Sequence, residues 1–190
     1  MSKNYSTQNE LLLTNLLDFY KKNDNLDKML NIINGESAIS LRIIDWFATN
    51  YAKKYYTVYN LTSCEKRLKV YNDYKLKLKA YSKKRFDPFC RWDRINIPYK
   101  EGKLIQTTIG QLNFFKWALD NEIIKYIEEN YSTIEKDMNN RNSTAKNRKC
   151  DEISNSNTNT NKTRKKREEL SVSASKSIKR ETVEIIVKFD

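Results

Sequence analysis

Residues 66–103 of this chain read KRLKVYNDYKLKLKAYSKKRFDPFCRWDRINIPYKEGK. This stretch has thirteen Lys and Arg residues and four Asp and Glu residues, so it carries a net charge of +9 out of the +12 of the whole chain. Seven Tyr, Phe and Trp residues are interspersed among the charges. Cations release the counterions condensed on a phosphate backbone, and aromatic rings either stack on bases or pack beneath a basic surface. The stretch therefore predicts nucleic-acid binding.

The same residues predict a helix followed by a β-hairpin. Residues 66–86 fit both the alternation of a strand and the spacing of a helix. Asn72 is a good N-cap, and Lys, Leu and Ala are good helix formers, so we favour a helix from Asn72 to about Arg85. Asp87–Pro88 should end it, because proline disfavours α geometry at the preceding residue. Residues 94–98 and 104–108 then form two strands joined by a turn.

On the predicted helix, Lys75, Lys79 and Lys83 recur along one side. Like charges at this spacing destabilise a helix mildly, and an anion lying against them would relieve the repulsion. A lysine face that is merely solvated explains the pattern equally well, and spacing alone does not separate the two. The candidate nucleic-acid-binding residues are Lys66, Arg67, Lys69, Lys75, Lys79, Lys83, Lys84, Arg85, Arg91, Arg94, Lys100, Lys103, Arg164, Lys165, Lys166 and Arg167.

The residues before this stretch begin with two predicted helices. Thr7 and Glu10 form a capping box ahead of a helix over residues 8–21. Asp24 can cap a second, short helix, which should end at Gly35 because an Asn-Gly pair readily takes left-handed geometry. These helices are expected to pack a core or a partner.

A third helix begins at Ser37 or Ser40 and covers residues 41–56, with one apolar stripe typical of a core helix. Residues 57–63 lose this spacing and contain β-prone Thr, Val and Tyr, which favours a strand or a loop. The chain up to residue 65 is neutral, with seven cations and seven anions.

After the hairpin, Thr107 or Thr108 caps the longest predicted helix, roughly residues 109–135. Its apolar residues define a broad face that should lie in the core. Residues 104–140 carry a net charge of −3, from three lysines and six acidic residues. This part of the chain is therefore not expected to contact a polyanion.

The composition changes at residue 140. Residues 140–180 are rich in Asn, Ser, Thr, Lys and Arg with little to bury, which predicts a disordered basic linker. Its cluster at residues 162–167 fits a nuclear-import signal, a nucleic-acid tether or a solubilising linker. Residues 181–190 are β-prone and need a sheet edge, either that of their own hairpin or that of a partner protein. The length of the linker favours a partner, which would bind Thr182–Asp190.

The composition also argues against catalysis and cofactors. The chain has no histidine, only three glycines and three scattered cysteines. This excludes His-based zinc sites, His-activated nucleophiles, Walker loops and dinucleotide-binding turns. A metal-dependent site built from carboxylates alone stays formally open, because Asp73 and Glu101 each precede a lysine by two residues. Such triplets are expected by chance in a stretch this rich in lysine, so we expect no enzyme activity, no cofactor and no metal. The polar start and the absence of a long apolar run predict an intracellular protein without a membrane span.

The expected fold is a mainly helical α+β domain over residues 1–139 with a small β-hairpin, a disordered basic tail and a C-terminal strand. The element order resembles a winged helix-turn-helix, in which a hairpin contacts phosphates and a helix enters the major groove. Either residues 86–92 (FDPFCRW) or the lysine-rich helix would then be the recognition helix.

Several stretches resemble uncharacterised proteins of nucleocytoplasmic large DNA viruses of the mimivirus and phycodnavirus kind. They are ISLRIIDWFATNYAKKY, YNDYKLKLKAYSKKRFDPFCRWDRI, TTIGQLNFFKWALDNEIIKYIEEN and the ending SVSASKSIKRETVEIIVKFD. The resemblance implies a viral protein located in the virion, the host cytoplasm or viral factory, or the nucleus. It assigns no activity and no catalytic residue.

Together these observations predict a non-enzymatic viral DNA-binding or genome-organising protein that contacts phosphates of double-stranded DNA with low sequence specificity. The alternative is a virion structural or assembly adaptor that binds a viral protein through its C-terminal strand. Salt-sensitive binding to DNA distinguishes the two, because an adaptor needs no phosphate contacts.

Overall fold

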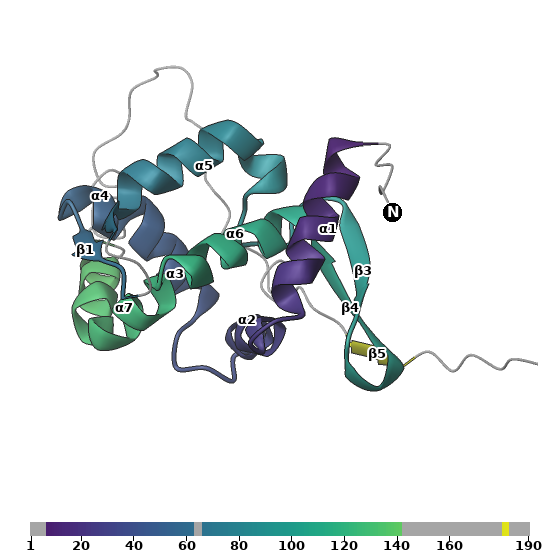
Figure 1. The fold of residues 1–190 in the computed structure, drawn as a ribbon. Coiled ribbons are helices and arrows are strands. Elements are labelled where there is room, and N and C mark those ends of the chain that lie inside the picture. The colour runs from purple at the N-terminus through teal and green to yellow at the C-terminus, as the bar shows by residue number, and fades with distance from the viewer. Residues whose placement is uncertain (1–6, 63–65, 142–179, 183–190) are drawn as a thin grey trace, which may run out of the picture.

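A computed structural model describes residues 7–62, 66–141 and 180–182 (Figure 1). These residues form a mainly helical domain with two small antiparallel sheets, which confirms the expected fold class. The elements are α1 (Gln8–Tyr20), α2 (Asn25–Asn34), α3 (Leu41–Trp46), the π-helical turn η1 (Phe47–Tyr51), α4 (Ala52–Lys54), β1 (Val58–Asn60), β2 (Arg67–Lys69), α5 (Val70–Arg85), β3 (Arg94–Pro98), the 3-10 turn η2 (Lys100–Gly102), β4 (Lys103–Thr108), α6 (Ile109–Asp120), α7 (Ile123–Glu129) and β5 (Arg180–Thr182). Residues 131–141 are also helical.

The central element is α6, which buries eight of its twelve residues. Figure 1 shows α5 lying along one side of α6 while α1 crosses it near the β3–β4 hairpin. Phe114 and Phe115 are completely buried. The hydroxyl group of Tyr20 on α1 donates to the carbonyl of Leu112 at 2.7 Å, so a polar bond also joins α1 to the centre.

The helix boundaries of the N-terminal region match the sequence prediction closely. Thr7 and Glu10 form the expected capping box at α1, and Ser40 caps α3. Gly35 ends α2 with a left-handed φ of 77°. The expected cap at Asp24 is wrong in its chemistry, because this residue lies at the N-cap of α2 with a φ of 51° and its side chain makes no capping hydrogen bond.

Residues 41–54 do not form the single regular helix that was predicted. The helix changes to a π-helical turn at Phe47–Tyr51 before α4 closes it. Phe47 is fully buried there, and its ring packs 5.3 Å from that of Tyr126. Apolar spacing does not report such a turn, because it depends on the packing of these rings. The strand expected within residues 57–63 is β1.

The lysine-rich helix begins earlier than predicted. Arg67–Lys69 form β2, which pairs antiparallel with β1 and matches Lys69 to Val58. α5 then starts at Val70, with Lys69 as its N-cap, so Asn72 lies inside the helix. The alternation of exposed Arg67 and Lys69 around buried Leu68 explains the strand. α5 ends at Arg85, before Asp87–Pro88, as predicted.

A second departure within α5 is a kink at Ser82. This residue has φ 58° and ψ 171°, which is not helical, and such backbone geometry is strained for any residue except glycine. The predicted stripe is therefore interrupted: Lys75 and Lys79 share one regular helical face, whereas Lys83 follows the kink.

The kink directs the end of α5 onto the first turn of α6. The amide of Asp87 donates to the carbonyl of Gly110 at 3.1 Å, and the side-chain amide of Asn113 donates to the carbonyl of Arg85 at 2.9 Å. A Cβ atom on Gly110 would lie only 3.0 Å from the carbonyl oxygen of Lys84. The close approach of these backbones requires glycine at position 110.

The hairpin has the predicted strands within one residue. β3 pairs with β4 from Arg94–Thr108 to Pro98–Leu104. β5 adds to the other edge of β4, with Lys103 opposite Thr182 and Ile105 opposite Arg180. The start of the C-terminal segment thus joins its own hairpin, while residues 183–190 of the expected strand lie outside the described residues, as does most of the 140–180 linker.

The helix predicted over residues 109–135 is broken. α6 ends at Asp120, and Glu122 takes a left-handed φ of 53° before α7. Residues 86–92, one of the two candidate recognition helices, contain no helix. Within the described ranges, no helix is long and apolar enough to cross a membrane.

Candidate nucleic-acid interface

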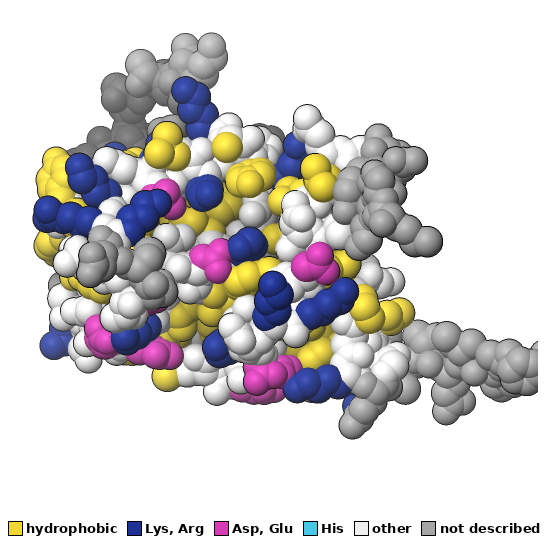
Figure 2. Space-filling view, viewed as in Figure 1, with side chains coloured by type: hydrophobic (Ala, Val, Ile, Leu, Met, Phe, Trp, Pro, Cys, Tyr) yellow, Lys and Arg dark blue, Asp and Glu magenta, His cyan; other side chains and the backbone are white. Residues whose placement is uncertain are grey.

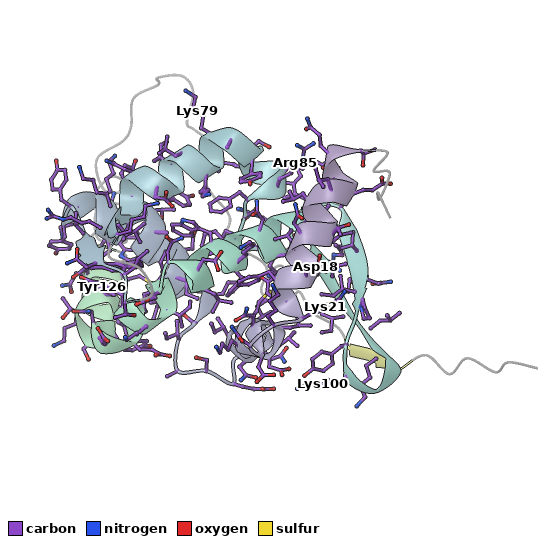
Figure 3. The ribbon with its side chains drawn as sticks, in the orientation of Figure 1. Asp18, Lys21, Lys79, Arg85, Lys100 and Tyr126 are labelled. Atoms are coloured by element: carbon purple, nitrogen blue, oxygen red, sulfur yellow. The ribbon has the colours of Figure 1, made fainter. Side chains whose placement is uncertain are left out.

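The outer side of α5 is the most basic helical surface in the described part of the chain. Lys75 and Lys79 are exposed and make no ion pair with any described residue. Figure 3 shows Lys79 extending outward from α5. Asp73, the helix's only acid, points inward and accepts a hydrogen bond from the Trp117 indole at 2.6 Å. The helix thus separates its acid from its outer lysines.

A shallow hollow of about 560 Å³ follows this outer side. Its lining residues are Asn72, Lys75, Leu76, Leu78 and Lys79. Leu76 is 65% exposed. This surface offers two cations and an apolar contact, a combination that suits a nucleic-acid backbone better than a small-molecule pocket, since such pockets enclose most of their ligand.

Most aromatic residues of the basic stretch pack beneath α5. The ring of Tyr74 lies 5.9 Å from Phe86 and 5.8 Å from Trp117, and Tyr81 stacks 6.5 Å from Phe86. Burial and then the charges of Asp45 and Asp87 raise the pKa of Tyr74 to about 12, so this phenol stays neutral at ordinary pH. These rings support the helix and are not available to stack on bases.

Cations of the neighbouring elements extend the lysine face of α5. Lys66, Arg67 and Lys69 are exposed along β2, immediately before α5. The ammonium of Lys53 on α4 lies 5.8 Å from the ring centroid of Tyr71. Tyr71 precedes Lys75 by one helical turn, so Lys53 adjoins the lysine face. We call Lys53, Lys66, Arg67, Lys69, Lys75 and Lys79 the basic surface.

Sequence reasoning missed Lys53, because the first 65 residues are neutral as a whole. Figure 2 shows Lys and Arg side chains gathered over α4 and the start of α5. The six residues of the basic surface do not form a sequence motif. The pairing of β1 with β2 and the packing of Lys53 on Tyr71 bring α4 beside α5. The Lys53-Lys54 pair at the end of a predicted helix was the one available signal.

Other predicted cations already have partners. Lys84 pairs with Asp93 at 2.9 Å, and Lys100 at the hairpin tip pairs with Asp27 of α2 at 2.5 Å. Arg91 makes two bonds of 2.8 Å to the buried carboxylate of Asp87. These three cations stabilise the fold and contribute less free positive charge to a ligand.

The remaining candidates lie apart from the basic surface or outside the described residues. Arg85 reaches the side chain of Gln8 on α1 at 3.4 Å (Figure 3), and Arg94 donates to the side chain of Gln106 at 3.0 Å. Lys103 is half-buried and has an interaction partner. Arg164–Arg167 lie outside the described residues.

A second hollow, of about 580 Å³, lies between α4 and residues 131–141. Asp137 lines it and accepts hydrogen bonds from Lys54 at 2.5 Å, Tyr55 at 3.1 Å and Trp46 at 3.2 Å. Burial alone would raise the pKa of Asp137, but these hydrogen bonds outweigh it and lower the pKa. The carboxylate is thus held in its charged form, which disfavours an anion at this place.

No described residues group three or more Cys, Asp or Glu side chains in a way that would hold a metal ion.

The fold and the basic surface define a small, mainly helical domain with one exposed, lysine-rich helix. The chain belongs to the family of unknown function DUF7197, whose model matches residues 2–188. It is 42% identical over 176 residues to "Uncharacterized protein L507" of Acanthamoeba polyphaga mimivirus, an alignment that covers 82% of this chain and 68% of the mimivirus protein. The resemblance to giant-virus proteins is thereby confirmed. No solved structure matches the chain, so the winged-helix comparison stays a prediction.

Proposed function

We propose that this protein is a non-enzymatic viral DNA-binding or genome-organising protein whose basic surface holds the phosphates of the nucleic acid. The observation that carries the proposal is the outer face of α5, where Lys75 and Lys79 are exposed and have no carboxylate partner among the described residues. A fold does not need such a face for its own stability, because like charges one turn apart weaken a helix.

The kind of cation on this surface predicts low sequence specificity. Five of its six cations are lysines, and lysine binds phosphate as a point charge on a flexible stem. Base edges are instead recognised by bidentate Arg, Asn or Gln side chains held in a groove. The basic surface should thus bind many sequences with similar affinity.

The alternative, a virion structural or assembly adaptor that binds a partner through the C-terminal strand, has a different basis. Arg180–Thr182 pair with an edge of the protein's own β4, and under this alternative a partner binds the residues that follow them. The relationship to a giant-virus protein fits both proposals. In an adaptor, the basic surface would meet an acidic protein or a membrane surface. We place DNA binding first because a phosphate backbone accommodates a row of exposed lysines.

The test compares two double variants with the same change in charge. Lys75→Glu with Lys79→Glu alters the basic surface, whereas Lys22→Glu with Lys28→Glu alters exposed lysines at the end of α1 and in α2. If all six cations contact phosphates, log K of the wild type should fall against log salt with a slope of roughly −5. The first pair should reduce that slope by about 2 and the control pair should leave it nearly unchanged.

Thermal unfolding of both variants shows whether they remain folded. Exposed lysines contribute little to stability, so neither melting temperature should fall by more than a few degrees. Equal losses of affinity in the two variants would contradict the proposal, since binding would then depend on total charge alone.

A further inference from the structure

Tyr56, just after α4, combines two features that oppose stability. Its side chain is 86% exposed, more than any other large hydrophobic residue described. Its φ of 48° lies in the left-handed region, where a bulky L-residue is a genuine outlier. A single exposed aromatic residue is ordinary, but one that also strains its backbone calls for a reason beyond folding.

The hydrogen bonds around Tyr56 show what this position needs structurally. The amide of Thr57 donates to the carbonyl of Ala52 at 3.2 Å, the long bond that closes a helix through a left-handed residue. Glycine usually occupies that position, and α2 follows this rule with Gly35 at φ 77°. The end of α4 would therefore be more stable with glycine in place of Tyr56.

The surroundings of Tyr56 are cationic. Lys53 of the basic surface lies three residues before Tyr56 on α4. Val58, two residues after Tyr56, is directly opposite Lys69 in the β1–β2 sheet. The neighbouring Tyr55 is already engaged: its ring lies 4.5 Å from Tyr51 and its hydroxyl group donates to Asp137. Tyr56 is thus an exposed aromatic residue in the segment between Lys53 on α4 and the strand that pairs with β2.

We propose that Tyr56 stacks on an unpaired base of a single-stranded nucleic acid whose backbone lies on the basic surface. This inference rests on the proposed function and narrows it to ligands with unpaired bases. Every base has a π-face, so stacking on an aromatic ring tolerates any sequence. Bases within a duplex are already stacked on their neighbours and cannot use the ring in this way.

Trp92, an exposed aromatic residue of the basic stretch itself, is a weaker candidate. It is 43% exposed. Arg91 beside it is held by Asp87, and Arg94, two residues after it, donates to Gln106. A stacking site needs free cations beside the ring to hold the backbone. Near Tyr56 in the chain and in the sheet register are Lys53 and Lys69, neither of which pairs with a carboxylate among the described residues.

The experiment measures fluorescence anisotropy with the full-length protein, a labelled 20-nucleotide oligo-dT strand and a 20-base-pair duplex of mixed sequence. The variants are Tyr56→Gly, Tyr56→Asn and Tyr56→Phe. Glycine and asparagine remove the ring at a position whose backbone suits both, so melting temperatures should stay the same or rise. Phenylalanine keeps the ring and serves as the conservative control.

Tyr56→Gly and Tyr56→Asn should each lose about 5- to 150-fold in affinity for the single strand, the range measured for single base–aromatic contacts. Their duplex affinity should change by less than about twofold, and Tyr56→Phe should bind the strand almost as the wild type does. An unchanged single-strand affinity, or equal losses on strand and duplex, would overturn the stacking role and leave the proposed function standing. A wild-type protein that binds neither ligand would overturn the proposed function itself.

Discussion

α5 and α6 pack against each other, yet they bury very different shares of their residues. α6 buries eight of its twelve residues, whereas α5 buries only Val70 of its sixteen. α6 is explained by the core that it fills. α5 contributes some half-buried rings to that core, but its outer lysines contribute nothing to it, and the proposed nucleic-acid binding rests on them.

The largest expected effect contrasts a core residue of α6 with an exposed residue of α5. Phe114→Ala should lower the free energy of unfolding by about 3–5 kcal/mol, because it removes a fully buried ring and leaves a cavity. Leu76→Ala, at a side chain that is 65% exposed, should change it by less than about 0.5 kcal/mol. Urea unfolding measures both. A loss at Leu76 similar to that at Phe114 would show that the outer side of α5 is buried in solution.

The next effect concerns the segment that joins α5 to the hairpin. Arg91→Ala should cost about 2–3 kcal/mol, since it leaves the carboxylate of Asp87, which is only 2% exposed, without its charged partner. Lys84→Ala removes an exposed pair with Asp93 and should cost under about 1 kcal/mol. If the two variants were equally stable, Arg91 would be free to bind a ligand as the sequence alone predicted.

A smaller effect tests the contact between the two helices. Alanine usually stabilises a helix relative to glycine by about 1 kcal/mol. Gly110→Ala should instead lower the stability of this protein by about 1 kcal/mol, because the new Cβ would meet the carbonyl oxygen of Lys84, whose segment is hydrogen-bonded to α6. Chemical unfolding measures the sign of this change in the free energy of unfolding. A stabilised variant would mean that the backbones of α5 and α6 can separate without cost.

The smallest effect is a gain. Ser82→Gly should stabilise the protein by up to about 1 kcal/mol, because glycine adopts the φ of 58° at Ser82 without strain. Ser40→Gly is the control, since Ser40 is an N-cap in extended backbone whose hydroxyl accepts from Ile43, and losing it should destabilise α3. A loss of stability at Ser82 would mean that its side chain maintains the kink.

The order of the helices and strands could be predicted from the sequence, but the features that depend on tertiary contacts could not. The capping box at Thr7, the glycine after α2 and the hairpin were predictable because each depends on a few neighbouring residues. The kink at Ser82 was not, because it follows from the hydrogen bonds that hold Arg85 and Asp87 on α6.

The residues of the candidate site show the same difference between what local sequence predicts and what tertiary contacts decide. Composition identified the lysines of α5, and their exposure fits that prediction. It could not show that Lys100 meets Asp27, a residue 73 positions away, or that Lys53 lies by Tyr71. Pairings of this kind decide which cations are free, and they arise only from the tertiary fold.

Lysine footprinting locates the DNA contacts directly, because it uses the protein with its wild-type sequence. The full-length chain is acetylated briefly with and without mixed-sequence DNA, and the modification of each lysine is measured by mass spectrometry. We expect DNA to protect Lys53, Lys75 and Lys79 and to leave the acetylation of Lys22 and Lys28 unchanged. Equal protection of the two groups, or none at Lys75 and Lys79, would contradict the claim that the outer face of α5 is the binding surface.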